Sequence, residues 1–171
     1  MKLMLFCVES NKQKQVDWIY IRSLLRNLFV EDKSITIRPI FMNGRSNYDS
    51  NKVRREILSW AKRGYESVTV VLCVDTDYFE TKADQKKELE GIGEYCKQNN
   101  YEFVWFCHDI EEVLIGHSVA DSEKVACATN YERKEQYKTV ETKRLTGKKY
   151  LKGSSNFISV LEKYYKLKES L

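Results

Sequence analysis

The chain has 171 residues, of which 42% are apolar and 32% are charged, and this composition excludes an intrinsically disordered chain. The length suits a single domain that spans residues 1–171 around one sizeable core. The net charge is +4, and no apolar run approaches the ~20 residues that a membrane-spanning helix needs, so we expect a cytoplasmic protein with no membrane partner.

The first part of the chain alternates apolar runs with amphipathic stretches. Residues 2–8 are a short apolar run that predicts a buried strand, and residues 13–29 carry apolar side chains at helical spacing. Residues 34–41 are rich in β-branched side chains and predict a second strand, although Pro39 disfavours a central position in a sheet. The pattern in residues 51–63 predicts a second helix.

The next part continues this alternation. Residues 67–74 form a continuous apolar run, which suits a strand buried on both faces of a parallel sheet. Residues 81–99 predict a polar helix, residues 102–107 a fourth strand, and residues 110–115 a short helix.

Beyond residue 120 the periodicity is weaker. Residues 121–137 are compatible with a helix, and residues 139–152 have the composition of a basic loop. Residues 154–167 predict a last helix, capped by Ser154 or Ser155.

This order of elements predicts an α/β fold. Strands that alternate with helices indicate a three-layer sandwich, here with a mostly parallel four-stranded sheet and C-terminal helices. We expect the core to span about residues 2–117 and a helical, basic extension to span about residues 118–171. In such folds, ligands bind beyond the carboxyl ends of the strands.

Carboxylates follow three of the four predicted strands. Glu9 follows the first strand, Asp75 and Asp77 follow the third, and Asp109 and Glu111 follow the fourth. A single acidic residue at a strand-to-helix turn is usually an N-cap, but several at one edge suit the oxygen-preferring cations Mg²⁺ or Mn²⁺. Because residues i and i+2 of an extended segment point the same way, we expect Asp75 and Asp77 to face one ion, with Glu9 beside them.

These carboxylates also carry a family resemblance. A glutamate after strand one and D-x-D after strand three resemble the Toprim fold of topoisomerases, primases and small nucleases. The resemblance implies that Glu9 is a general acid/base or metal ligand, that Asp75 and Asp77 bind Mg²⁺, and that the fold is Toprim/Rossmann-like.

A second stretch narrows this resemblance. Residues 110–117, IEEVLIGH, are similar to the F-E-x-W-L-L-L-H segment of RloB-like proteins, a Toprim-related family linked to phage defence. The spacing from Glu111 to His117 matches, whereas Ile110, Val113 and Gly116 depart from the pattern. The resemblance implies a nuclease in bacterial defence that works with a partner protein, with Glu111 as a supporting acid and His117 as an accessory group.

The basic residues gather late in the chain. Residues 133–152 contain eight Lys or Arg against two Glu. A solvated face explains such a run, and so does contact with a nucleic-acid backbone. On the second interpretation, the candidate contacts are Arg45, Lys143, Arg144, Lys148 and Lys149.

The five cysteines do not suggest a structural metal site. They are widely spaced and form no C-x-x-C pair, so a structural zinc site is not expected from the sequence. Cysteines in apolar strands commonly act as small core residues.

Two functions from different classes remain open. The first is an Mg²⁺- or Mn²⁺-dependent nuclease that hydrolyses DNA or RNA. The second is a non-catalytic subunit that binds nucleic acid or protein on the same scaffold. A phosphotransfer domain of flavodoxin-like shape is a third, weaker alternative, because no lysine follows the fourth strand.

Overall fold

A computed structural model of the chain describes residues 1–169. Its centre is one five-stranded sheet in the order β2-β1-β3-β4-β5. The first four strands run parallel to one another, and β5 runs antiparallel to β4. The strands are β1 Lys2–Val8, β2 Ile35–Phe41, β3 Val68–Asp75, β4 Glu102–Cys107 and β5 Ser154–Ser155.

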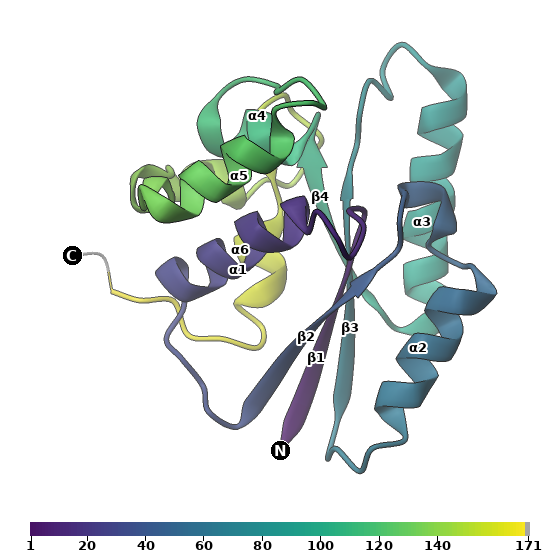
Figure 1. The fold of residues 1–171 in the computed structure, drawn as a ribbon. Helices are drawn as coiled ribbons and strands as arrows, with labels where there is room; N and C mark the ends of the chain where they lie inside the picture. Colours follow the sequence, from purple (N-terminus) through teal and green to yellow (C-terminus); the bar gives the residue numbers. More distant parts are fainter. Residues whose placement is uncertain (170–171) are drawn as a thin grey trace.

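Helices cover both faces of this sheet, so the α/β class and the three-layer arrangement are as expected (Figure 1). The α-helices are α1 Val16–Leu28, α2 Asn51–Ala61, α3 Ala83–Asn99, α4 Ile110–Ile115, α5 Lys124–Arg133 and α6 Phe157–Leu161. Three short 3₁₀ helices are η1 Arg45–Asn47, η2 Gln136–Thr139 and η3 Thr142–Leu145.

The sheet divides the apolar interior into two cores. One core lies under α2 and α3 and includes Leu5, Leu72 and Ile92. The other lies under α1, α4, α5 and α6 and includes Phe6 and Phe106. Successive strand residues therefore point into opposite cores, and this explains the continuous apolar runs of β1 and β3.

The edge position of β2 agrees with its proline. Within the described sheet β2 pairs with β1 alone, and Pro39 lies opposite Phe6. An edge strand has one side without a partner strand, so the missing N–H of proline interrupts no central ladder.

The expectation of a four-stranded sheet is wrong, because Ser154 and Ser155 form a fifth strand. They lie opposite Cys107 and Phe106 of β4. The predicted helix over residues 154–167 is correspondingly reduced to Phe157–Leu161. Two serines carry no apolar alternation, so their pairing with β4 is a tertiary effect that sequence periodicity does not reveal.

The segment between α4 and β5 is partly as predicted. The helix expected in residues 121–137 appears as α5 followed by η2, and the basic loop expected in residues 139–152 is interrupted by η3. Among residues 1–169, no helix is long and apolar enough to cross a membrane.

Candidate functional site

The carboxyl edge of the sheet brings Glu9, Asp75 and Glu111 to one region. Glu9 directly follows β1, Asp75 is the last residue of β3, and Glu111 lies in the first turn of α4 after β4. The backbone N–H of Asp75 donates to Oε1 of Glu9 at 2.8 Å. Oδ1 of Asp75 in turn accepts from the N–H of Ile110 at 3.0 Å, which links β3 to the start of α4.

Asp17 is a further half-buried acid, which the sequence patterns did not predict. It lies in the first turn of α1, and its Oδ2 accepts from the N–H of Ser10 at 2.6 Å. An acid in a first helical turn is ordinary because it stabilises the helix dipole. Only the packing of α1 against the sheet brings the charge of Asp17 near enough to raise the pKa values of Glu9 and Asp75.

These four acids share an environment that favours their neutral forms. Burial, followed by repulsion from Asp17, raises the pKa of Glu9 to about 8. Burial and then the charge of Glu9 raise the pKa of Asp75 well above its usual range. Burial also raises the pKa of Asp17 and brings that of Glu111 to about 7. A group of acids held this way gains strongly from any cation that enters among them.

Glu111 has the least satisfied side chain of the group. It is 1% exposed, and neither carboxylate oxygen has a hydrogen-bond partner in the described chain. The Nζ of Lys124, from the start of α5, lies 3.7 Å from its Oε2. No sequence pattern connects Lys124 with Glu111, because their contact depends on how α5 packs against α4.

Asp77 is turned toward Arg45, although its charge still helps to raise the pKa of Glu9. The chain leaves the extended conformation after Asp75, and Asp77 adopts a left-handed backbone with φ of 48°. Its Oδ2 lies 3.1 Å from Nη1 of Arg45. The expected alignment of Asp75 and Asp77 assumed an extended segment, and the turn at Asp77 removes that condition.

Arg45 is a buried arginine rather than a solvent-facing one. Its side chain is 7% exposed, and its Nη1 donates to the carbonyl oxygen of Asp75 at 2.6 Å. Its Nε donates to Glu88 at 2.9 Å. The guanidinium therefore joins η1, the end of β3 and α3, and it is engaged by three partners.

Arg45 apart, the other four basic residues predicted to bind nucleic acid are exposed, and they fall into two pairs. Lys143 and Arg144 lie in η3, where Glu141 is 3.0 Å and 3.8 Å away from them. Lys148 and Lys149 lie in the loop before β5 and form no ion pair with any residue between 1 and 169. The second pair is thus the more available for a phosphate.

His117 and Glu111 are not on one surface. α4 ends at Ile115, and Gly116 caps it in a left-handed conformation. His117 is exposed just past this end and lines a hollow of about 440 Å³ between α4 and α5. Glu111 instead points into the protein.

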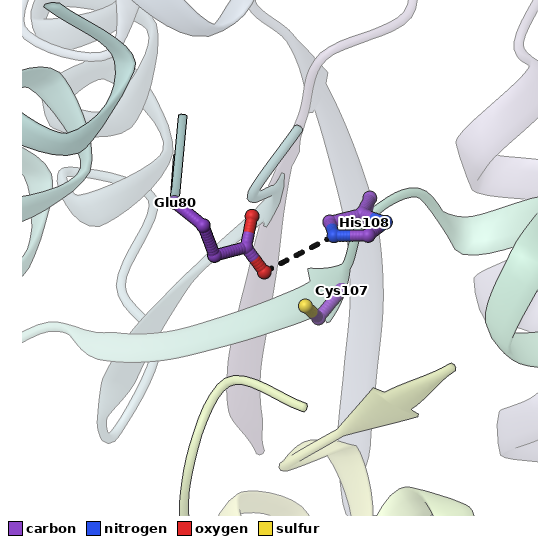
Figure 2. A group of neighbouring side chains, drawn as sticks. All are labelled: Glu80, Cys107 and His108. Atoms are coloured by element: carbon purple, nitrogen blue, oxygen red, sulfur yellow. Dashed lines mark hydrogen bonds and ion pairs between the residues drawn. The ribbon is translucent and has the colours of Figure 1, made fainter. Parts of the chain in front are cut away.

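A different set of side chains has metal-ligand spacing. Glu80, Cys107 and His108 each offer a ligand atom, and these atoms all lie within 4.8 Å of one another (Figure 2). It is the one such group of three in residues 1–169, so Glu9, Asp75 and Asp77 do not approach one another this closely. The sequence alone gives no role to His108, and Cys107 lies in an apolar strand, where a cysteine is expected to be a small core residue.

Comparison with known proteins adds no family. No protein-family description, no curated protein and no solved structure matches this chain.

Proposed function

We propose that the protein is an Mg²⁺- or Mn²⁺-dependent nuclease of Toprim type. The observation that carries this proposal is the group of Glu9, Asp75 and Glu111, in which Glu111 is buried, Glu9 and Asp75 are half-buried, and all three pKa values are raised. Folding places these acids together at the edge where ligands of parallel α/β sheets bind. Such an arrangement is costly unless protons or a cation compensate it.

The donor set fits a hard divalent cation. Carboxylate oxygens are the ligands that Mg²⁺ and Mn²⁺ prefer, and the two oxygens of Glu111 have no hydrogen-bond partner within the described residues. Glu9 and Asp75 would hold the ion, with Glu111 as a supporting acid. Asp77 is the remaining expected ligand, and it would first have to release Arg45.

The chemistry proposed here is phosphodiester hydrolysis of DNA or RNA. A bound cation would supply a more acidic water and offset charge on the phosphate. Glu9, with its pKa near 8, is suited to accept or donate a proton near neutral pH. Lys148 and Lys149 would contact the backbone of the nucleic acid. A role in phage defence with a partner protein rests on the RloB-like resemblance.

Metal-dependent stabilisation is the first test of this proposal. We expect Mg²⁺ or Mn²⁺ to raise the melting temperature of the chelator-treated protein, because a ligand that binds only the folded state stabilises it. Asp75→Asn should remove the shift, and Asp84→Asn, an exposed acid in the first turn of α3, should retain it. No shift with the unaltered chain would contradict the proposal.

Cleavage is the second test. Single- and double-stranded DNA and RNA are incubated with each metal, and Asp77→Ala and Glu9→Gln are expected to abolish cleavage. Cleavage that is unchanged in Asp77→Ala would show that Asp77 has no part in the mechanism.

A non-catalytic subunit is the second candidate, and the Arg45–Asp77 pair favours it. That ion pair, 3.1 Å long, satisfies Asp77 without a cation. In this case nucleic acid should bind equally well with and without a chelator. The double variant Lys148→Ala, Lys149→Ala should weaken binding, and the salt dependence of the binding constant should fall by the amount expected for about two lost phosphate contacts. Cleavage and metal-dependent stabilisation would both be absent.

A further inference from the structure

A second cluster with metal-binding chemistry lies beside the carboxylate group, at the junction of β4 with the loop after β3. Its members are Glu80 from the loop, and Cys107 and His108 from the end of β4. The Nε2 of His108 lies 3.1 Å from Oε1 of Glu80. Figure 2 shows the Glu80 carboxylate reaching toward the His108 ring, with the sulfur of Cys107 on the same side.

The surrounding residues hold the His108 ring in place. Oε2 of Glu112 lies 3.1 Å from Nδ1 and also accepts the backbone N–H of His108 at 3.0 Å. The carbonyl of His108 accepts from the N–H of Asp77 at 2.9 Å. The ring centroids of Tyr78 and His108 lie 5.0 Å apart. A carboxylate on the far ring nitrogen is the usual partner of a metal-binding histidine, because it sets the tautomer and the ring orientation.

We propose that Glu80, Cys107 and His108 form a zinc site. A thiolate, an imidazole nitrogen and a carboxylate are the ligand types of zinc, whereas Mg²⁺ prefers oxygen alone. Nε2 of His108 would bind the ion while Nδ1 donates to Glu112. Three protein ligands leave one tetrahedral position for water or an outside ligand, which is the arrangement of an open zinc site rather than a closed structural one.

The cluster can contract onto an ion with little rearrangement. Zinc bonds of about 2.0–2.3 Å place the atoms of tetrahedral ligands less than about 4 Å apart. The ligand atoms of Glu80, Cys107 and His108 already lie within 4.8 Å of one another. Cys107 is fully buried and His108 is 14% exposed, so both are held by the fold. Glu80 is 43% exposed and is the side chain able to move, which makes its side the entry path. The Cys107 thiol releases its proton to solvent as the Zn–S bond forms.

Metal stoichiometry and cobalt spectroscopy test this site in the full chain. After chelator treatment, native mass spectrometry should show one Zn²⁺ per chain. Co²⁺ should give a thiolate-to-cobalt charge-transfer band that Zn²⁺ abolishes and excess Mg²⁺ leaves in place. Zinc bound only by the carboxylates of Glu9 and Asp75 would give no such band, and that result would overturn the proposal.

Variants with matched controls assign the ligands. Glu80→Gln alters an exposed side chain and should weaken zinc binding without loss of folding, and Glu94→Gln, also exposed, should not. Cys107→Ser and His108→Gln should abolish the cobalt band.

The remaining controls are one cysteine and one histidine outside the cluster. Cys127→Ser and His117→Gln should leave the band unchanged. Glu112→Gln should lower zinc affinity about 10- to 100-fold while the thiolate band persists, as expected for a positioning residue. Equal zinc affinity in the unaltered chain, Glu80→Gln and Cys107→Ser would overturn the assignment. Asp75→Asn should not affect this site, so its outcome is separate from that of the proposed nuclease.

Discussion

Glu111 illustrates how burial alone changes the chemistry of one residue. Its carboxylate is almost fully buried, and Lys124 at 3.7 Å is beyond hydrogen-bond distance. Burial raises its pKa from the ordinary value of 4.5 to about 7. Between these two pH values the folded chain keeps a proton that the unfolded chain has released, so folding and protonation are coupled.

The first prediction is that the metal-free protein loses stability as pH rises. Because the folded state binds more protons, the contribution of Glu111 is full below pH 4.5 and is lost as pH rises through about 7. The pKa of Glu9, about 8, extends the pH range over which stability is lost to about pH 8. Each retained proton changes the free energy of unfolding by about 1.4 kcal/mol per pH unit.

Urea unfolding in a chelator, repeated between about pH 5 and pH 8, measures this slope. Glu111→Gln should make the slope shallower by about 1 kcal/mol per pH unit, because the amide does not titrate. A slope that is the same in the variant would show that Glu111 is ionised in the folded chain.

The second prediction concerns Arg45. Arg45→Ala leaves Glu88 and Asp77 without their cation and the Asp75 carbonyl without its donor. Removal of one partner of a fully buried ion pair costs about 3–5 kcal/mol, and partial exposure of the two acids reduces this to about 2 kcal/mol. Thermal unfolding measures the loss, with the exposed Arg55→Ala as control. Weaker nucleic-acid binding at unchanged stability would instead support a phosphate clamp.

The sequence predicted some site residues and missed others for a physical reason. Glu9, Asp75 and Glu111 lie at or shortly after the ends of β1, β3 and β4, so strand order alone places them at one edge. Lys124 meets Glu111 only after α5 packs, and His108 meets Glu80 only because a separate loop folds against the end of β4. The lack of C-x-x-C excludes one type of zinc site but does not bear on ligands drawn from distant segments.

At the scale of elements, the strongest local signals gave the best boundaries. β1, β4 and α4 have the predicted bounds at both ends. Apolar runs define the two strands, and Asp109 caps α4 by accepting the N–H of Glu112 at 2.7 Å. β5 had no local signal, because its two serines become a strand only through β4.

The third prediction tests the attachment of β5 to the sheet at Gly147, with Gly93 of α3 as the contrasting position. A Cβ on Gly147 would lie 2.9 Å from Trp105 and 3.1 Å from the carbonyl oxygen of Ser155, so Gly147→Ala should cost about 1–3 kcal/mol. A Cβ on Gly93, within α3, would meet Phe103 at an ordinary 3.8 Å. Gly93→Ala should therefore stabilise the chain by about 0.5–1 kcal/mol. Chemical denaturation distinguishes the two signs, and stabilisation by Gly147→Ala would mean that β5 moves away easily.

At the scale of the whole molecule, the C-terminal part completes a core rather than extending it. Tyr131 of α5 packs edge-on against Tyr20 of α1, with ring centroids 4.9 Å apart. Phe157 of α6 is fully buried and contacts Phe29 and Phe106. The sequence motifs end near residue 117, and for this reason we expected the core to end there. The apolar core instead contains residues from both sides of that position.

The fourth prediction is that residues 1–117 do not fold alone. Truncation would remove α5 and α6 and expose Tyr20 of α1 and Phe106 of β4, and a domain cannot retain one half of a shared core in water. Circular dichroism and gel filtration should show an unfolded or associated fragment. Phe157→Ala in the full chain is the milder test and should cost about 3–5 kcal/mol. A fragment of residues 1–117 that unfolds cooperatively as a monomer would show that α5 and α6 are not needed for the core. The carboxylate group would then have to keep its arrangement without Lys124.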